Sequence, residues 1–513
     1  MTKTTWDVIV VGSGMGGMVA AAALSRVGKR VLLLEQYSKL GGQTHSFSRD
    51  GFRWDVGLHY LGGFGPGEPE RAILDWLTNS PIKMAPMGPV YDTLHIGDAA
   101  PLQLSRPIEA QKLDLRDRFP DETKSIDAWF DAIERGRDAT TTIMHARAIP
   151  KILGKGISWW KRRELDRWCA RTTADVISDI TNNDELAAVL AAQWADFGGR
   201  PSQASFALHA TIPGCYLGGA YYPVGGAGVI AEGLLPTITA AGGETRAAVR
   251  VDSFLLEGDR VTGVTTTSGE TIQANAVVST MGARETVEML DPTDPEYRAW
   301  ADDVLELQPN LCHFSLFLGF SGDIEAAGAS KSNHWLYPTG EVDVTWATAP
   351  EGTPPGMFVS FASLKDPSHD AGPELKHSGE LLAWTDWSTV ARWADQASGE
   401  RGDDYQEFKR RVEEAMLTQF RNYFPALAEL VVFRELSTPL ATAAITGHNF
   451  GAFYGLEVTP RRMLSDALRM KTPVKGLYLA GQDALTPGIP GAMWGGFLSA
   501  ASIDPKVFTH LSG

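Results

Sequence analysis

The sequence predicts an α/β fold in which a mostly parallel β-sheet with flanking helices is assembled from separated pieces of the chain. Near the start, a β-branched run at 8–11 ends in glycines and is followed by an Ala-rich helical stretch at 18–24 and a second apolar run at 30–35. Strand, turn, helix and strand in this order form a βαβ unit. Near the end, a short apolar run at 476–481 again leads into a glycine, and we expect it to join the same sheet.

The elements between these two ends change in character along the chain. Glycines and prolines crowd 57–69 and mark the end of the βαβ unit, after which 70–200 has a mostly helical and charged pattern. Strand-like and helical segments mix from 311 to 433. The middle of the chain predicts a helix at 229–241, strands near 248–256 and 276–279, and a hairpin of 261–267 with 270–274.

The length of the chain predicts more than one domain. A chain of 513 residues is too long for a single hydrophobic core, and its 43% hydrophobic content is sufficient for two. We expect one discontinuous nucleotide-binding domain, with a mixed α+β substrate or cap domain inserted into it. The expected boundaries are 1–66, 221–300 and 436–513 for the first domain, and 67–220 and 301–435 for the second.

Composition excludes several classes of protein. A net charge of −16 argues against nucleic-acid binding, which depends on Lys and Arg that neutralise phosphates. The three cysteines are far apart and form no Cys-x-x-Cys pair, so we expect a reducing compartment, the cytoplasm, and no structural metal. No signal-peptide pattern and no apolar run of bilayer-spanning length is present, which predicts a soluble or peripheral protein.

A phosphate-binding turn is expected between the first strand and the first helix. Gly12-Ser13-Gly14-Met15-Gly16-Gly17 has the spacing Gly-x-Gly-x-x-Gly in this strand-to-helix context. Gly12 permits a tight turn, Gly14 lets the backbone approach a pyrophosphate, and Gly17 lets the helix pack closely on the sheet. Glu35 ends the second strand, where its carboxylate can accept hydrogen bonds from a ribose diol. These features together predict a dinucleotide site without deciding between NAD and FAD.

Motifs at both ends of the chain resemble one family of flavoproteins. Gln36 is followed by Gly41-Gly42-Gln43-Thr44-His45-Ser46-Phe47, and then by Phe52-Arg53-Trp54-Asp55-Val56-Gly57-Leu58-His59-Tyr60. The late motif is Leu479-Ala480-Gly481-Gln482-Asp483, followed by Pro487-Gly488-Ile489-Pro490-Gly491-Ala492. This pattern is similar to the phytoene desaturase, carotenoid isomerase and retinol saturase branch of the flavin amine oxidase superfamily. The wider superfamily usually has Arg where this chain has Gln43.

The resemblance implies a Rossmann-type FAD-binding domain and a set of cofactor contacts. The late Asp483 is expected to bind the ribityl hydroxyls, and the helix start after it to face the pyrimidine edge of the isoalloxazine. The middle segment resembles a further FAD-contacting stretch, with Val251 expected at the adenine and Ser279 nearby. The expected cofactor-binding residues are Gly12, Ser13, Gly14, Met15, Gly16, Gly17, Glu35, Gln36, Gly41, Gly42, Gln43, Thr44, His45, Val251, Ser279, Gly481, Gln482, Asp483, Gly488, Gly491 and Ala492.

The chemistry that the resemblance implies is saturation, desaturation or isomerisation of C=C bonds in a lipophilic polyene such as a carotenoid or retinoid. Reduction of a C=C bond also needs a proton, and His59 and Tyr60, expected beside the flavin, are the candidate donors. Their alternative role is structural, in hydrogen bonding and packing. Six aromatic residues between Phe314 and Phe361 have the spacing of an apolar sheet face, which favours core over a substrate tunnel.

Residues 145–171 form a basic and apolar segment within an acidic chain. The segment holds eight basic residues against Glu164 and Asp166, so its charge is +6 while the whole chain carries −16. Isoleucines, Leu153 and two tryptophans recur at near-helical spacing within it. This pattern is typical of a helix that lies on a membrane surface, and we expect a peripheral membrane contact here. The alternatives are a solvated helix face and a subunit contact.

Two other functions fit parts of the sequence. A flavin amine oxidase would share the glycine motifs, although Gln43 departs from its pattern. A non-enzymatic flavin-binding protein would hold the cofactor without turnover. No second glycine motif for NAD(P)H is evident, so the electron donor or acceptor is expected to be external to the chain.

Overall fold

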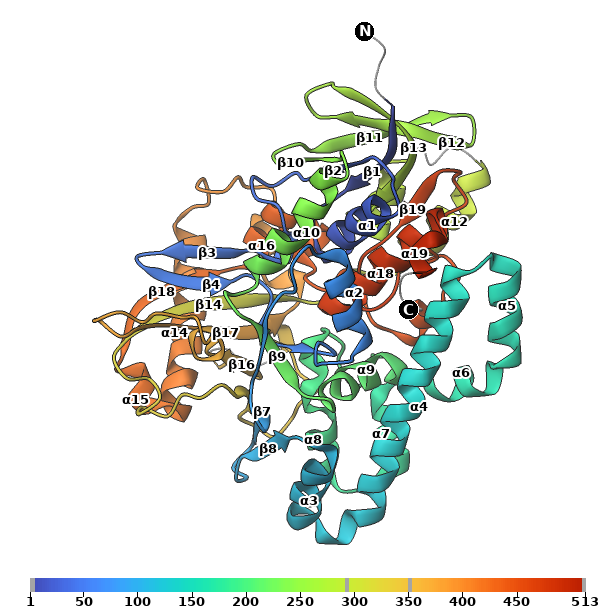
Figure 1. Cartoon of the computed structure of the whole chain (residues 1–513). Helices are drawn as coiled ribbons and strands as arrows, with labels where there is room; N and C mark the ends of the chain where they lie inside the picture. Colours follow the sequence, from blue (N-terminus) through green and yellow to red (C-terminus); the bar gives the residue numbers. More distant parts are fainter. Residues whose placement is uncertain (1–4, 291–294, 349–352, 510–513) are drawn as a thin grey trace.

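The structure is a computed structural model that describes residues 5–290, 295–348 and 353–509. Its first sheet has the strand order β10-β2-β1-β13-β12-β11, and β19 pairs with β13 (Figure 1). Strands β10, β2, β1, β13 and β19 run parallel, whereas β12 and β11 are antiparallel additions. The strands are β1 (Trp6–Val11), β2 (Val31–Leu34), β10 (Glu244–Arg246), β11 (Val251–Glu257), β12 (Arg260–Thr266), β13 (Thr271–Ser279) and β19 (Leu477–Leu479).

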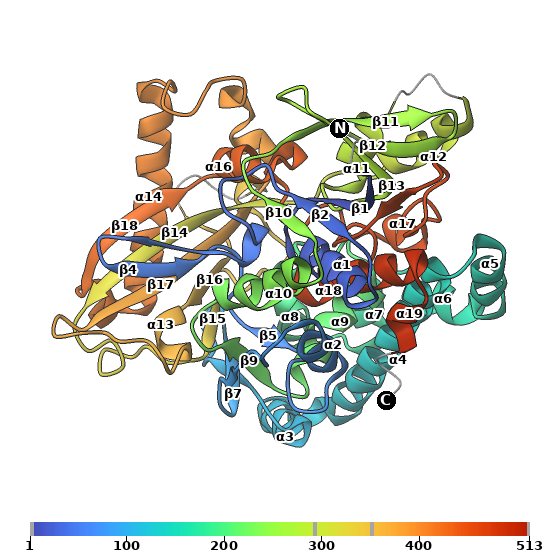
Figure 2. The ribbon, with the colours of Figure 1, turned by 45° about the horizontal axis from the view of Figure 1, so that its top comes forward.

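Three helices cover this sheet and bring distant parts of the sequence together. They are α1 (Met15–Arg26), α10 (Gly228–Ala240) and α18 (Gly488–Ile503). Helix α1 is almost entirely buried and packs against both α10 and α18, so it lies at the centre of this lobe (Figure 2). The expected βαβ unit, the β12–β13 hairpin and the late strand are all present, and the α/β fold is confirmed.

The second sheet has the order β18-β14-β17-β16-β15-β7-β8, with β15 and β7 parallel and the other pairs antiparallel. The aromatic residues of β14 to β16 are buried, as expected for a sheet face; most lie in the two cores that flank this sheet, and Phe317 packs with Phe52 and Trp54 of β4 (Phe52–Asp55). Its strands are β7 (Val90–Ile96), β8 (Leu102–Ser105), β14 (Cys312–Ser321), β15 (Asn333–Tyr337), β16 (Met357–Ser360), β17 (Lys376–Thr385) and β18 (Val431–Ser437).

The prediction of a mostly helical 70–200 is wrong for β7 and β8. Strand β7 carries Asp92 and Thr93, which are both buried although their side chains are polar. Asn333 and Gln193 donate hydrogen bonds to Asp92, and these partners lie far away in the sequence. Local alternation of polar and apolar residues therefore could not indicate a buried strand here.

Apart from β6 at 84–86 and the connecting loops, the remainder of 70–216 is helical, and most of its helices form a lobe below the first sheet (Figure 1). This lobe contains α3 (Ile108–Arg118), α4 (Thr123–Ala148), α5 (Lys151–Trp160), α6 (Arg162–Trp168), α7 (Thr173–Ile180), α8 (Asp184–Ala191) and α9 (Phe206–Tyr216). Helix α2 (Pro69–Leu77) instead packs against α1 in the core of the first sheet. Across the described ranges, no helix combines the length and the apolar content needed to cross a bilayer.

Smaller elements connect these layers. Two small sheets pair β3 (Ser46–Arg49) with β4 (Phe52–Asp55), and β5 (Leu61–Gly62) and β6 (Met84–Pro86) with β9 (Ala220–Pro223). The other helices are α11 (Ala283–Glu288), α12 (Pro295–Leu305), α13 (Ala362–Lys365), α14 (Asp403–Tyr423), α15 (Pro425–Ala428), α16 (Pro439–Thr446), α17 (Pro460–Leu464) and α19 (Lys506–Thr509).

Candidate functional site

A cavity of about 370 Å³ lies at the carboxyl ends of the parallel strands of the first sheet. Val11, Leu34 and Ala480, at or next to the ends of β1, β2 and β19, are part of its wall. Ligands of open α/β sheets bind at this edge, outside the carboxyl ends of the strands. The volume falls in the range of small-molecule sites.

The glycine turn between β1 and α1 has the geometry that the motif predicts. Gly12 adopts a φ of +99°, which favours glycine, and a side chain at Gly17 would collide with the carbonyl of Gly12. Gly14 has no atom within 4 Å of the position that a Cβ would occupy. Since Gly14 lines the cavity, this open space is where a ligand can approach the backbone.

Two helix N-termini meet at the same cavity. Gly14 is the N-cap of α1 and Gly488 is the first residue of α18, and both line the wall. Neither helix has an acidic residue in its first turn, so the unpaired N–H groups there carry an uncompensated partial positive charge. This arrangement suits an anionic ligand such as a pyrophosphate or a reduced flavin ring.

Glu35 is positioned by backbone and side-chain donors of the turn. The backbone N–H and the hydroxyl of Ser13 donate to Glu35 Oε2 at 2.8 and 2.7 Å, and the N–H of Tyr37 donates to Oε1 at 2.8 Å. The Ser13 hydroxyl in turn accepts a hydrogen bond from the Gly41 N–H at 2.9 Å. Glu35 therefore lines the cavity in a fixed orientation, with lone pairs left for a ribose diol.

The two ends of the chain are in contact at this cavity. A Cβ on Gly16 would lie 2.6 Å from Gly481 Cα and 2.9 Å from the carbonyl oxygen of Ala492. The amides of Gln43 and Gln482 both donate to the carbonyl of Phe453, at 3.3 and 3.2 Å. Residues more than 400 positions apart thus share one wall, because glycine at 16 lets the backbones approach.

Asp483 links the late motif to the middle segment. Its carboxylate accepts hydrogen bonds from the N–H of Ala283 at 2.8 Å and from the N–H of Leu456 at 2.9 Å. Arg462 donates to the carbonyl of neighbouring Gln482 at 2.6 Å and is fully buried. Asp483 lines the cavity, and its contacts fix three separated segments around it.

The structure brings most of the expected cofactor-binding residues to this cavity. Those in the wall are Gly12, Gly14, Met15, Gly16, Glu35, Gln36, Gly42, Gln43, Thr44, His45, Val251, Gly481, Gln482, Asp483, Gly488 and Ala492. Ser13, Gly17, Gly41, Ser279 and Gly491 do not line the cavity. Ser279 hydrogen-bonds to Thr286 at 2.7 Å, and its neighbour Thr280 takes the place in the wall.

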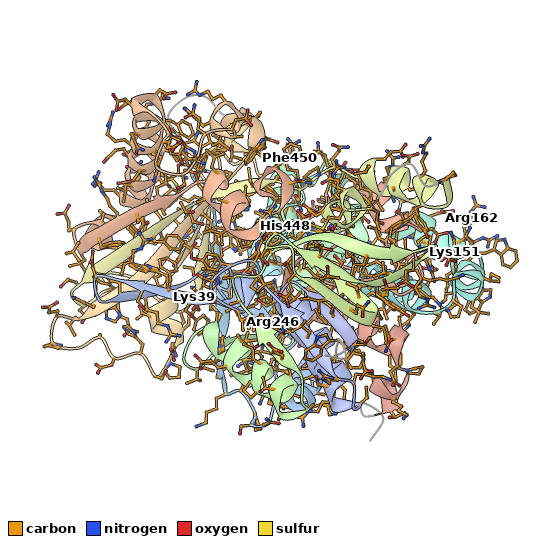
Figure 3. All side chains as sticks on the ribbon, turned by 90° about the horizontal axis from the view of Figure 1, so that it is seen from above. Lys39, Lys151, Arg162, Arg246, His448 and Phe450 are labelled. Atoms are coloured by element: carbon orange, nitrogen blue, oxygen red, sulfur yellow. The ribbon has the colours of Figure 1, made fainter. Side chains whose placement is uncertain are left out.

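Sequence reasoning missed one side of the cavity. The loop from Ile445 to Asn449, with Phe453 and Tyr454, contributes to the wall without a recognisable motif. His448 lies between the first and the second sheet in Figure 3, and its Nδ1 is 3.8 Å from Glu285 Oε1. Burial lowers the pKa of His448, but the nearby carboxylate of Glu285 raises it above its ordinary value. Arg250, next to the predicted Val251, adds a cationic group to the wall.

Tyr60 lies beyond the end of the cavity, in a buried polar cluster. Val56 and Gly57 line the wall, and the chain then carries Tyr60 Oη to within 3.0 Å of Asp92 Oδ2 and 2.7 Å of Asp196 Oδ2. A tyrosine hydroxyl has one proton, so its contact with the second carboxyl group requires a proton on that group. Burial, and then the negative charge of Asp92, raise the pKa of Asp196 well above its ordinary value. Burial raises the pKa of Asp92 as well, but the hydrogen bonds from Asn333 and Gln193 oppose this rise, which favours Asp196 as the group that holds the proton.

His59 and Lys365 flank this cluster. Burial lowers the pKa of His59 to about 3, with the charge of Lys365 adding to the effect. Burial also raises the pKa of Glu380, whose Oε2 lies 3.8 Å from His59 Nδ1, so burial disfavours the charged form of both groups in this contact. Lys365 Nζ donates to the carbonyl of His59 at 2.9 Å and to Ser360 Oγ at 2.7 Å. Burial lowers the pKa of Lys365 to about 7.

Known proteins resemble the chain along its whole length. Residues 10–77 match the family of NAD(P)-binding Rossmann-like domains. All-trans-retinol 13,14-reductase of Rattus norvegicus is 30% identical over 524 residues, which cover 97% of this chain and 85% of the relative. Prolycopene isomerase 1, chloroplastic, of an Oncidium hybrid cultivar is 24% identical, covering 94% of this chain and 81% of the relative.

Solved structures show the same fold at lower identity. Cyclohexylamine oxidase from Brevibacterium oxydans superposes with a TM-score of 0.64 and 17% identity, covering 98% of this chain and all of that chain. At this identity the likeness concerns the fold alone. The similarity to the reductase extends over nearly the whole chain, and both ends of the chain meet at one cavity with the features of a dinucleotide site. The two observations indicate the same family. The chain belongs to the FAD-dependent oxidoreductase family of phytoene desaturases, carotenoid isomerases and all-trans-retinol saturases.

Proposed function

We propose that the protein is an FAD enzyme that saturates, desaturates or isomerises C=C bonds of a lipophilic polyene of the carotenoid or retinoid class. The carrying observation is the 30% identity across nearly the whole chain with a protein named as a retinol 13,14-reductase. The similarity to a prolycopene isomerase supports the same substrate class. Amine oxidases share only the fold at 17% identity, and Gln43 departs from their motif.

We propose that FAD occupies the cavity along its length. When bound, FAD supplies hydride transfer to or from carbon. Gly14 and the first N–H groups of α1 would hold the pyrophosphate, and Glu35 the adenosine ribose, with Val251 at the adenine. Asp483 and the start of α18 would hold the ribityl chain and the pyrimidine edge. The open space at Gly14 and the absence of acidic residues from both helix starts support this fit.

We propose that Tyr60 delivers the proton in a saturation reaction, with Asp196 as its source, and that neutral His59 has a structural role beside this pair. The contact of Tyr60 with two carboxyl groups supports this role, since it holds a proton in a buried chain of hydrogen bonds. The low pKa of His59 weighs against a charged imidazolium as the acid. Isomerisation needs no net electrons and would use the same site.

The proposal includes the domain division, the partners and the location. The cofactor domain would comprise 1–66, 221–300 and 436–513, and the substrate domain 67–220 and 301–435, with α2 of the second domain packed on the core of the first. The enzyme would be cytoplasmic and membrane-associated through 145–171, and would exchange electrons with an external donor or acceptor. The exposed basic and apolar surface of that segment supports the membrane contact.

Anaerobic incubation of the purified flavoprotein with polyenes, fatty acids and amines tests the proposed chemistry. We expect polyenes alone to be converted, with a change of mass for saturation or desaturation and of retention alone for isomerisation. Reduction of the flavin by amines, with hydrogen peroxide formed in air, would indicate an amine oxidase instead. Bound flavin without turnover of any compound would indicate a binding protein.

The proton route has its own test in two variants. Tyr60→Phe should lower the saturation rate by roughly 100-fold or more while FAD content stays unchanged. In the Asp196→Asn variant, the side-chain amide can still donate a hydrogen bond to the Tyr60 hydroxyl, but it cannot titrate. The wild-type rate should fall as pH rises through the raised pKa of Asp196, and the Asn variant should lack this fall. Equal pH profiles in the two proteins would refute the route.

A further inference from the structure

Helix α5 exposes its large apolar side chains to solvent. The exposed fractions are 85% for Ile152, 60% for Leu153, 77% for Trp159 and 74% for Trp160. At about 100° per residue, these four positions fall within an arc of roughly 120°. A helix of a soluble domain normally turns such a stripe to the core, so the orientation of α5 is the reverse of the usual one.

The face of α5 that carries Gly154 packs on the body of the protein and fixes the helix in this orientation. Gly154 is its one buried residue, and a side chain there would collide with the carbonyl of Ala146 on α4. Arg469 donates to the carbonyl of Ala146 at 2.6 Å and also to that of Ile149, so the turn between the helices is held by a buried guanidinium. The apolar stripe is therefore presented outwards by a well-supported helix.

Basic side chains surround the stripe. Lys151 at the start of α5 and Arg162 at the start of α6 both lie at the edge of the molecule (Figure 3). Lys155, Arg163 and Arg167 are exposed as well, and Lys161 lies 4.9 Å from the centre of the Trp160 ring. Arg147 was expected to belong to this surface but is buried, where it donates to the carbonyls of Arg462, Met463 and Ala484. Glu164 and Asp166 are exposed on the same surface, and Lys155 and Arg162 form ion pairs with Asp466 and Asp166 at 3.5 and 3.4 Å. The other basic residues outnumber these acids, so this end still has the opposite sign to the chain at −16.

We propose that α5 and the start of α6 dock the enzyme on an anionic lipid bilayer. Ile152, Leu153, Trp159 and Trp160 enter the interface, and the surrounding Lys and Arg contact lipid phosphates. Tryptophan suits this depth because its ring is apolar and its N–H remains able to hydrogen-bond. In a symmetric dimer this basic surface would face its own copy and like charges would repel, so the charge of the surface favours an anionic bilayer over such a dimer. One part of this inference rests on the proposed function: that a lipophilic substrate enters the enzyme from the bilayer. The docking itself does not depend on it.

Co-sedimentation of the full flavoprotein with lipid vesicles tests the docking surface. We expect binding to vesicles that contain phosphatidylglycerol, weaker binding to pure phosphatidylcholine, and loss in high salt. The triple change Lys161→Gln, Arg162→Gln, Arg163→Gln should weaken binding on the order of 100-fold. Trp159→Ser with Trp160→Ser should weaken it roughly 10-fold or more.

A matched control is available on the opposite side of the molecule. Lys409→Gln, Arg410→Gln, Arg411→Gln removes the same charge from α14 (Figure 2) and should leave vesicle binding unchanged. Equal loss in both triple variants, or no binding of the wild type to anionic vesicles, would overturn the proposal. The proposal would also be overturned if analytical ultracentrifugation showed a dimer of the wild type and a monomer of the Trp159→Ser, Trp160→Ser variant. Vesicle binding needs no turnover, so its failure is distinct from failure of the proposed chemistry.

Discussion

Replacing Gly14 by Ala adds one methyl group at the point where the cofactor phosphates are proposed to lie. The backbone of Gly14, with φ −61° and ψ 174°, accepts any residue, and no protein atom lies within 4 Å of the new Cβ. The free energy of unfolding of the apoprotein should therefore change by no more than about 0.5 kcal/mol. With FAD present the methyl group is an overpacked atom and should cost about 1–3 kcal/mol of binding, a weakening of roughly 5-fold to 150-fold.

Two measurements on the same protein separate these effects. Urea unfolding of the apoprotein gives its stability, and quenching of flavin fluorescence during titration gives the FAD dissociation constant. Gly156→Ala is the matched control, because this glycine also has no atom near its Cβ position but lies on exposed α5. Unchanged FAD affinity of Gly14→Ala, or a loss of apoprotein stability above about 1 kcal/mol, would refute the reasoning.

Three further changes probe the contact between the chain ends and the buried groups. Gly16→Ala should destabilise even the apoprotein by about 1–3 kcal/mol, because its Cβ would lie 2.6 Å from Gly481 Cα; an unchanged urea midpoint would contradict this. Asp483→Asn leaves one of two backbone N–H donors without an acceptor and should lower stability by about 1–3 kcal/mol together with FAD content. Burial lowers the pKa of His209 to about 4, so its contribution to stability is present above its ordinary pKa and lost as pH falls. Between about pH 7 and pH 5 the wild type should lose about 2 kcal/mol more than His209→Gln in urea unfolding, and equal losses would argue against a buried neutral His209.

Local patterns predicted the parts of the fold that local interactions form. The β1-α1-β2 unit and the β12–β13 hairpin each join neighbouring segments, so their spacing and turn residues were informative. The late strand could be placed because its glycine motif resembles that of a known family. Strand β7 could not be predicted, since Asp92 is buried through partners at positions 193 and 333.

The residues of the cavity likewise fall into two groups: those that a local motif predicts, and those that only the folded chain brings together. The glycine turn, Glu35 and Asp483 were predicted from motifs, and all but a few of the motif residues line the wall. The loop from Ile445 to Asn449 has no motif, because folding alone brings it to the cavity. The pairing of Tyr60 with Asp196 likewise joins residues 136 positions apart, which no local spacing encodes.

The most direct test of the account is a crystal structure of the protein purified with its flavin. We predict one FAD in the cavity, with its pyrophosphate at Gly14 and the N-terminus of α1, its ribityl chain at Asp483 and the pyrimidine edge of its isoalloxazine at the start of α18. A flavin bound elsewhere, or one that contacts only the N-terminal glycine turn and not the late segment, would contradict the claim that both ends of the chain form one cofactor site.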